Sequence, residues 1–273
     1  MYKILFLVMA SFCSAQSYRF VYEYKMKPDL AIDSLVTDYM NLDSDGKKSY
    51  FYNAAKYERD SAYSSTKNNA VLYNGKKYDQ NLGYIVEKEY AQKNIKFYDK
   101  YKTANLLVIE DEPQKWHIEK EFLKINNIDC QKATANYKGR VWEAWFSKEY
   151  PVNDGPYKFR GLPGLIVSLK DSEGNHVFNL IQIKKIKRIF VFLPKNNKEM
   201  NWKDYRKTLM TSTPNLADDI EAMSVDKSIG VMNLQFKDGY VAKFDLKELK
   251  KSGNPEDEIA KRLRRTNNPI EKE

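Results

Sequence analysis

The sequence alternates most regularly at residues 17–26, which read SYRFVYEYKM. Tyr18, Met26 and the three aromatic residues at the even positions between them fall on one face. Mostly polar side chains fall on the other face. A period of two with one polar face predicts a half-buried strand of an antiparallel sheet. Pro28 ends the strand, because proline cannot donate a hydrogen bond to the ladder.

Asp238-Gly239 lies between two alternating segments, and this dipeptide is the strongest short-range signal of a β-hairpin. Short connections predict an antiparallel meander, because parallel strands need crossovers of a dozen or more residues. We therefore predict a mainly β fold of the α+β class, built as a curved sheet or half-barrel. Further predicted hairpins join 39–42 to 49–52, 84–86 to 95–98, 128–135 to 140–146, and 165–169 to 176–183.

Helical spacing is weaker than strand alternation in this chain. Residues 202–210 are predicted as a helix with Asn201 as its cap. Residues 215–223 form a second predicted helix, and 255–264 a third, whose acids come early and bases late, as the helix dipole favours. Residues 53–63 are ambiguous. One domain is predicted over 16–273, with a second small domain beginning near residue 195 as the alternative.

The composition limits the classes of function. The chain has 273 residues, 46 Lys and Arg against 37 Asp and Glu, and a formal net charge of +9. Aromatic residues make up 14%, a content that disordered chains lack. Two Cys and two His exclude a disulfide scaffold and argue against His- or Cys-rich metal sites. We therefore predict a folded protein with no metal and no cofactor.

The first residues predict export. Residues 1–3 are a short basic start, residues 4–12 an apolar run, and Cys13-Ser14-Ala15 a site of small residues, as a secretory signal peptide requires. We predict cleavage after Ala15 and a mature protein in the periplasm or associated with the outer membrane. An anchor helix or a buried strand is the alternative. Cys13 follows the bulky Phe12, and this favours ordinary cleavage over lipidation, because a lipobox has a small residue there.

Residues 155–166 read GPYKFRGLPGLI and concentrate glycine and proline. Leu162-Pro163-Gly164-Leu165 fits a type II turn, with proline second and glycine where φ is positive. The turn leads directly into a strand, so we interpret the segment as a rigid strand-entry loop. It lacks the Gly-Lys-Ser/Thr ending and the following helix of a phosphate cradle. The structural motif consists of Gly155, Pro156, Gly161, Leu162, Pro163, Gly164, Leu165 and Ile166.

These residues resemble the GLPGLI family of exported Bacteroidetes proteins, which is named for the hexapeptide found here at 161–166. The flanking segments 130–134, 139–140 and 144–145 and the ending 267–271 are also similar to that family. The family is one of uncharacterised function. The resemblance therefore implies export and a β-rich fold, and it supplies no catalytic residue.

Aromatic residues near this loop are the candidate binding site. Trp142 and Trp145 are three residues apart in a predicted strand, so they point to opposite faces, and at most one of them fills a given core. Aromatic side chains beside a Gly-Pro loop can line a ligand cleft. The predicted binding residues are Trp142, Trp145, Tyr157, Phe159 and Arg160.

The leading interpretation is a non-enzymatic cell-envelope protein that binds a periplasmic or outer-membrane protein or an apolar ligand. Peripheral membrane contact fits the basic charge, and predicted export argues against nucleic acid. The alternative is a periplasmic hydrolase or a thiol-dependent enzyme built on Cys130 or His117. Cys130 also fits a strand as a small buried hydrophobe. His176 follows a predicted turn, so we expect it to be exposed.

Overall fold

The computed structural model describes residues 16–28, 30, 35–67, 82–101, 104–150, 152–189, 192–211, 220–236, 241–251, 253 and 269–272. Strands dominate this part of the chain and three short helices accompany them, which confirms the predicted α+β class. The predicted signal peptide at 1–15 and the predicted helix at 255–264 lie outside the described residues. No helix in the described part is long and apolar enough to cross a membrane.

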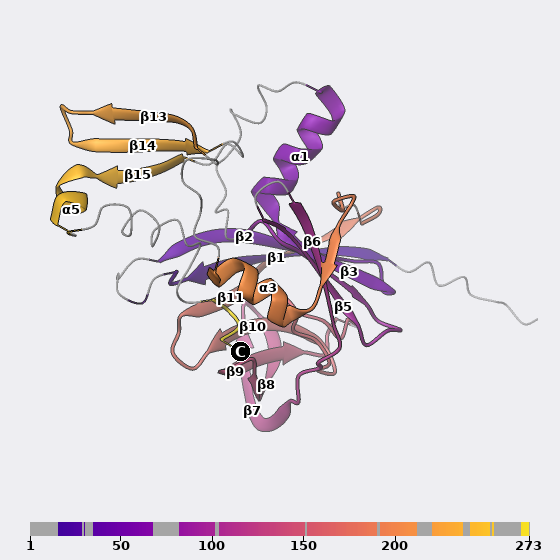
Figure 1. The fold of residues 1–273 in the computed structure, drawn as a ribbon. Helices are drawn as coiled ribbons and strands as arrows, with labels where there is room; N and C mark the ends of the chain where they lie inside the picture. Colours follow the sequence, from indigo (N-terminus) through magenta and orange to yellow (C-terminus); the bar gives the residue numbers. More distant parts are fainter. Residues whose placement is uncertain are drawn as a thin grey trace, which may run out of the picture.

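Twelve strands form one large curved sheet (Figure 1). In chain order they are β1 (Ser17–Met26), β2 (Val36–Ser44), β3 (Lys48–Asn53), β4 (Ile85–Glu89), β5 (Ile95–Tyr101), β6 (Ala104–Glu110), β7 (His117–Ile125), β8 (Ile128–Tyr137), β9 (Arg140–Ser147), β10 (Leu165–Asp171), β11 (His176–Ile186) and β12 (Lys198–Met200).

The order of strands in this sheet is β12-β6-β5-β4-β3-β2-β1-β11-β10-β9-β8-β7. It contains two antiparallel meanders, β2 to β6 and β7 to β11, as predicted, although the longer segments 54–84 and 148–164 connect β3 to β4 and β9 to β10. β1 joins them, because it pairs with β2 on one side and with β11 on the other. Among the described strands, only β12 pairs in parallel, with β6. The sheet ends at β12 and β7 and is not closed into a barrel.

The predicted hairpins are confirmed in their pairing. β8 and β9 meet with Ala133 opposite Ala144, and β2 and β3 meet around the turn at 45–47. β10 and β11 pair around the turn at 172–175, with Leu169 opposite Phe178. Local alternation therefore predicted which neighbouring segments pair, since a hairpin needs only nearby residues.

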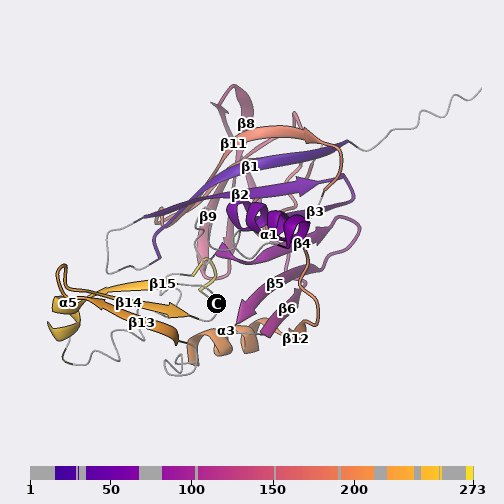
Figure 2. The ribbon, with the colours of Figure 1, turned by 90° about the horizontal axis from the view of Figure 1, so that it is seen from above.

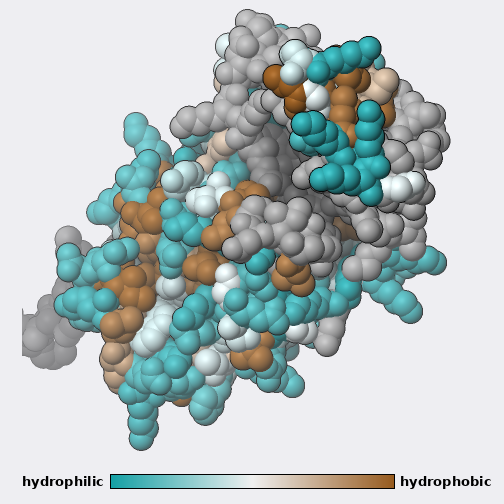
Figure 3. Space-filling view, turned by 90° about the vertical axis from the view of Figure 1, so that its left-hand side faces the viewer, coloured by the Kyte–Doolittle hydropathy of each residue, from teal (hydrophilic) through white to brown (hydrophobic). Residues whose placement is uncertain are grey.

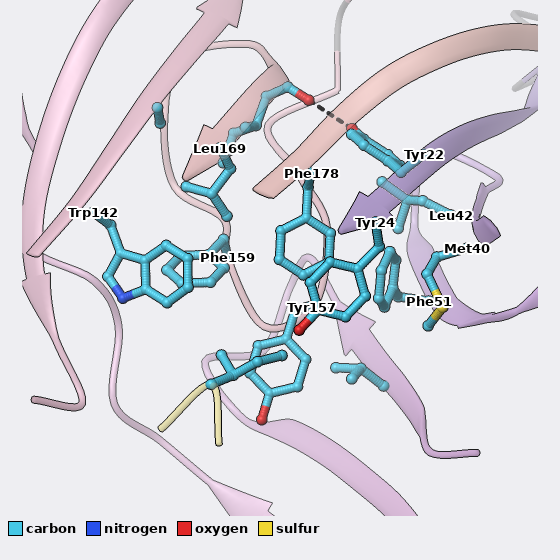
Figure 4. Close-up of a cluster of buried hydrophobic side chains, with 14 of the residues drawn as sticks. Tyr22, Tyr24, Met40, Leu42, Phe51, Trp142, Tyr157, Phe159, Leu169 and Phe178 are labelled. Atoms are coloured by element: carbon cyan, nitrogen blue, oxygen red, sulfur yellow. Dashed lines mark hydrogen bonds between the residues drawn. The ribbon is translucent and has the colours of Figure 1, made fainter. Parts of the chain in front are cut away.

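The concave side of the sheet holds the main core. The predicted apolar face of β1 is confirmed, because Phe20, Tyr22 and Tyr24 have no exposed surface. Tyr24 stacks on Phe178 of β11 with ring centroids 4.0 Å apart (Figure 4). The Tyr22 hydroxyl donates to the carbonyl oxygen of Ile166 at 2.6 Å. Seen from above, β1 and β11 lie on one side of the sheet and β5 and β6 on the other (Figure 2).

The opposite side of β3 to β5 is also covered. Tyr50, Tyr52, Ile85 and Tyr98 form a second buried cluster there, against which Tyr57 of helix α1 (Ala54–Thr66) packs. The ambiguous segment at 53–63 is thus helical. Its N-cap is Asn53, whose Oδ1 accepts from the Lys56 backbone N–H at 2.9 Å and satisfies a donor at the helix start.

The later part of the chain contains helix α3 (Trp202–Thr211), as predicted, and the Asn201 Oδ1 caps it by accepting from the Asp204 N–H at 2.8 Å. The predicted helix at 215–223 is wrong at its end, because residues 220–223 belong to a strand, while 215–219 lie outside the described residues. That strand pairs along a three-stranded sheet, and the ladder overrides weak helical spacing. The sheet consists of β13 (Ile220–Asp226), β14 (Val231–Phe236) and β15 (Val241–Asp245), and helix α5 (Leu246–Lys251) follows it.

This small sheet has its own core of Met232, Leu234, Phe244 and Leu249. β14 and β15 pair as predicted around Asp238-Gly239, although that turn itself lies outside the described residues. The assignment of residues 16–273 to one domain stays a prediction.

The turn before β10 differs from the predicted type II turn. The Gly164 N–H donates to the Leu162 carbonyl oxygen at 2.8 Å, so the chain makes a three-residue γ-turn centred on Pro163. Gly164 is required by close approach: a Cβ there would lie 2.1 Å from the Ser147 carbonyl oxygen on β9. Gly161, at φ +94°, has no atom within 4 Å of the corresponding position.

Replacing Gly164 by Ala should lower the free energy of unfolding by more than about 3 kcal/mol, because the methyl group meets a backbone carbonyl that cannot move without breaking the β9–β10 ladder. Gly161→Ala is the matched control. It adds only backbone strain, of roughly 1–3 kcal/mol. Urea unfolding of both variants measures the difference, and equal losses would show that close approach to Ser147 is not the constraint.

Candidate functional site

The segment 155–164, which the sequence singles out, lies on the concave side of the sheet. Phe159 has no exposed surface and packs on Trp142 of β9 with ring centroids 4.6 Å apart (Figure 4). Tyr157 is 3% exposed. The loop thus fills the concave side with its own side chains and carries the charged Lys158 into the core.

Lys158 is the centre of a buried ion cluster. Its ammonium contacts the carboxylate of Glu110, at the end of β6, and lies 2.7 Å from Oε1 of Glu271. The Tyr157 hydroxyl donates to the same Glu271 oxygen at 2.6 Å. The ammonium also lies 3.9 Å from the ring centroid of Trp202, a cation–π arrangement. Residues from four distant parts of the chain therefore converge on one cation.

Burial dominates the electrostatics of this cluster. It raises the pKa of the Glu271 carboxyl, an effect that the neighbouring Lys158 opposes, and it raises the pKa of Tyr157 well above its usual value. Among the described residues, Oε1 of Glu110 and Oε2 of Glu271 have no hydrogen-bond partner, although Lys138 Nζ lies 3.5 Å from the former. The carboxylates of Glu110 and Glu271 thus face two cations, Lys158 and Lys138.

A second buried pair holds the start of the motif. Lys88 of β4 and Asp154 have no exposed side-chain surface and form an ion pair. The Lys88 ammonium also donates to the Gly155 carbonyl oxygen at 2.7 Å, and the Tyr90 hydroxyl donates to Asp154 Oδ2 at 2.9 Å. Burial lowers the pKa of Lys88. This pair fixes the loop against β4, since an unpaired buried charge is costly.

The predicted binding residues separate into two groups. Trp142, Tyr157 and Phe159 are buried, so their side chains contribute to the core and not to an exposed surface. Trp145 is half-buried on the opposite face of β9, as the spacing predicts, and its Nε1 donates to Glu143 Oε1 at 3.2 Å. Arg160 is partly exposed and donates to the Glu89 carbonyl oxygen at 3.2 Å. Binding through Trp145 and Arg160 stays a prediction.

Most residues of the predicted motif contribute to packing. Leu162, Leu165 and Ile166 are at most 1% exposed. A Cβ at Gly155 would lie 2.6 Å from the Ile166 side chain, so this glycine allows the loop to cross the strand closely. Pro163 is exposed at the γ-turn.

The groups proposed for thiol chemistry do not assemble. Cys130 is 2% exposed, and burial raises the pKa of its thiol to about 11. His117 is exposed on β7 opposite Thr134, so it lies four residues along β8 from Cys130, roughly 13 Å away. His176 has no exposed surface, contrary to expectation, because the strand start after the turn enters the core. Its Nδ1 shares a 2.8 Å hydrogen bond with the Tyr24 hydroxyl.

An exposed apolar edge is a surface feature that sequence reasoning missed. β7 is the last strand of the sheet, and Phe122, Leu123 and Ile118 on it are 73%, 52% and 43% exposed. We call these three residues the β7 edge. The register with β8 is irregular between Ile118 and Phe122. The apolar residues within 117–125 are visible in the sequence among charged neighbours, but only the strand order shows that they lie at an edge.

Other surface features are small or outside the main sheet. Apolar side chains are exposed on the three-stranded sheet, where Met223 is 64% exposed (Figure 3). A hollow between α1 and β3, lined by Tyr52, Tyr57 and Phe192 among others, has a volume of about 10 Å³, enough for one water molecule. The described residues contain no group of three or more His, Cys, Asp or Glu side chains placed to hold a metal ion.

Comparison with known proteins finds a match to a family of unknown function and solved structures with a similar fold. The sequence model of a family described as "Protein of unknown function (Porph_ging)" matches residues 41–168, from β2 into β10. A search of curated proteins finds no match.

Solved structures of PNGF-II are similar in fold. The P21 crystal form gives a TM-score of 0.53 at 15% identity, covering 82% of this chain and 39% of that one. The C2 form gives 0.52 at 14% identity, covering 81% and 40%. At this identity the likeness concerns the fold alone. The chain spans about two fifths of the PNGF-II chains it matches.

Replacing Lys158 by Met should lower the free energy of unfolding by roughly 3–5 kcal/mol, because it leaves the buried Glu271 carboxylate without its cation and Glu110 with Lys138 alone. Lys170→Met is the matched control. Lys170 pairs with Glu143 at 3.1 Å but is half exposed, so the loss there should stay below about 1 kcal/mol. Urea unfolding at neutral pH compares them, and a small loss for Lys158→Met would contradict a compensating role.

Cys130 should resist alkylation in the folded protein, because its thiol is buried and its high pKa keeps it protonated at neutral pH. Mass spectrometry after iodoacetamide treatment should find one modified site only when denaturant is present. Rapid modification of the native protein at pH 7 would restore the thiol-enzyme hypothesis.

Proposed function

We propose that this chain is an exported, non-enzymatic cell-envelope protein of the GLPGLI type that binds a protein partner through the β7 edge. The observation that carries the proposal is the exposure of Phe122, Leu123 and Ile118 on the terminal strand of an open sheet. The signal-like residues 1–15 support export to the periplasm or outer membrane. The intact hexapeptide at 161–166 supports the family assignment.

An edge strand suits protein binding for a physical reason. One side of β7 pairs with β8, and among the described residues no strand pairs with its other side. Unpaired backbone groups there can accept a strand of another chain, and exposed apolar side chains add burial energy. Phe122 and Leu123 supply exposed apolar surface at one of the two ends of the described sheet.

A small apolar ligand inside the curved sheet is the less favoured version of the hypothesis. Ligand pockets for small molecules measure roughly 300–1,000 Å³. Here the concave side contains buried aromatic side chains of the motif loop and of β1 and β11. The small hollow beside α1 accommodates no ligand larger than water.

The enzymatic alternative has less support. A thiol-dependent enzyme needs a thiolate and a nearby base, whereas Cys130 is buried with a raised pKa and lies roughly 13 Å from His117 along the ladder. The similarity to PNGF-II supports a shared fold and transfers no activity at 15% identity. We therefore place the function at the surface and not at a buried reactive group.

Site-specific photo-crosslinking in intact envelopes tests the proposal. A photoreactive side chain at position 122 should capture one protein at least about tenfold more strongly than the same side chain at position 181. Ile181 is the matched control, because it is 49% exposed but lies on β11 inside the sheet. Leu123→Lys should abolish the capture without changing Tm, since the site is exposed.

Two outcomes would overturn this assignment. Equal capture from positions 122 and 181 would show that the β7 edge has no special affinity. Loss of the partner on Trp145→Ala, with full binding retained on Leu123→Lys, would place the site on the outer face of β9 instead.

A further inference from the structure

The C-terminal segment Pro269–Lys272 is held inside the fold (Figure 2, marked C). Ile270 is 9% exposed and belongs to the main core, and Glu271 is 2% exposed. Residues 252–268 separate this segment from α5, so it is distant in sequence from every element it contacts. This short segment therefore buries one apolar and one acidic side chain in a site formed by the rest of the fold.

The backbone of the segment is recognised by a fixed guanidinium. Arg140, at the start of β9, donates from Nη2 to the Pro269 carbonyl oxygen at 2.7 Å and from Nε to the Ile270 carbonyl oxygen at 3.0 Å. Asp171 of β10 holds the same guanidinium at 2.7 Å, and both side chains are 1% exposed. The Lys272 N–H donates to the Lys138 carbonyl oxygen at 2.9 Å. Pro269, Ile270 and Lys272 are thus bound through main-chain groups.

The side chains are recognised by burial and by charge. Ile270 enters the core, and the Glu271 carboxylate meets the Lys158 ammonium and the Tyr157 hydroxyl. Without the segment, the buried Lys158 ammonium would keep only the Glu110 carboxylate, which Lys138 also approaches at 3.5 Å. A second carboxylate beside Lys158 is therefore the group that completes the pairing of this buried cation.

We propose that the fold contains a peptide-binding site whose resident ligand is the chain's own Pro269–Lys272, and which takes peptides with an apolar residue directly before a carboxylate. The site is built by β9, β10, the β8–β9 turn and the motif loop, none of which includes the tail. A separate peptide with the sequence of Pro269–Lys272 offers the same carbonyl, apolar and carboxylate groups to this site. This proposal is independent of the partner bound at the β7 edge.

The test uses a chain that ends at Asn268 and a synthetic peptide covering residues 267–273. Removing the tail should lower Tm by roughly 5–10 °C, because buried charges lose their partner. Titrating the peptide should restore Tm in a saturable way. A labelled peptide should bind the shortened chain at least about tenfold more tightly than the full chain, whose site is occupied.

Peptide variants identify the recognition chemistry. Ile270→Asp and Glu271→Gln in the peptide should each weaken binding about tenfold or more. Lys272→Ala is the matched control, because its side chain only pairs with the half-exposed Glu173 and should change affinity less than about threefold. Equal affinity for all peptides, or no binding, would overturn the proposal.

Full stability of the shortened chain without peptide would also overturn it. Where the shortened chain is insoluble alone, recovery of soluble protein on co-production with the tail segment fused to a carrier protein supports the site, and no recovery overturns it.

Discussion

The pairing of the Lys158 ammonium is the interaction on which the fold depends. A cation with no exposed surface needs carboxylates that are themselves held in place. Glu110 comes from the end of the first meander, the Lys158 loop connects two strands of the second meander, and Glu271 comes from the chain end. The Lys158 ammonium therefore connects both meanders of the open sheet and the C-terminal segment.

An open curved sheet has a concave side and two edges, and in this chain each of the three is covered to a different extent. It fills the concave side with its own loop, whose Phe159 and Tyr157 lie among the aromatic side chains of the sheet. At one edge it adds the short parallel strand β12. At the other edge, β7 combines exposed apolar side chains with charged residues at 119–121 and an irregular register with β8. Charge and irregularity protect an edge against unselective pairing, so the proposed partner site rests on the exposed apolar side chains of β7.

The hexapeptide at 161–166 is explained by packing. Gly164 passes the Ser147 carbonyl oxygen too closely for a side chain, Pro163 makes the γ-turn, and Ile166 supplies a carbonyl oxygen to the buried Tyr22 hydroxyl. The residues just before the hexapeptide make the polar contacts. Lys158 and Tyr157 both bind the Glu271 carboxylate in the C-terminal segment. The motif and the tail site are thus parts of one arrangement.

Local patterns in the sequence determined the hairpins, the strand β1, the cap of α3 and the opposite orientation of Trp142 and Trp145, because each depends on residues close along the chain. Tertiary structure alone decided that β1 pairs with β11, that His176 and Lys158 are buried, and that β7 is an edge. Alternation shows that a strand has two unlike faces, but it does not show what covers either face. Contacts such as Tyr157 with Glu271 join residues more than a hundred positions apart, and no local period encodes them.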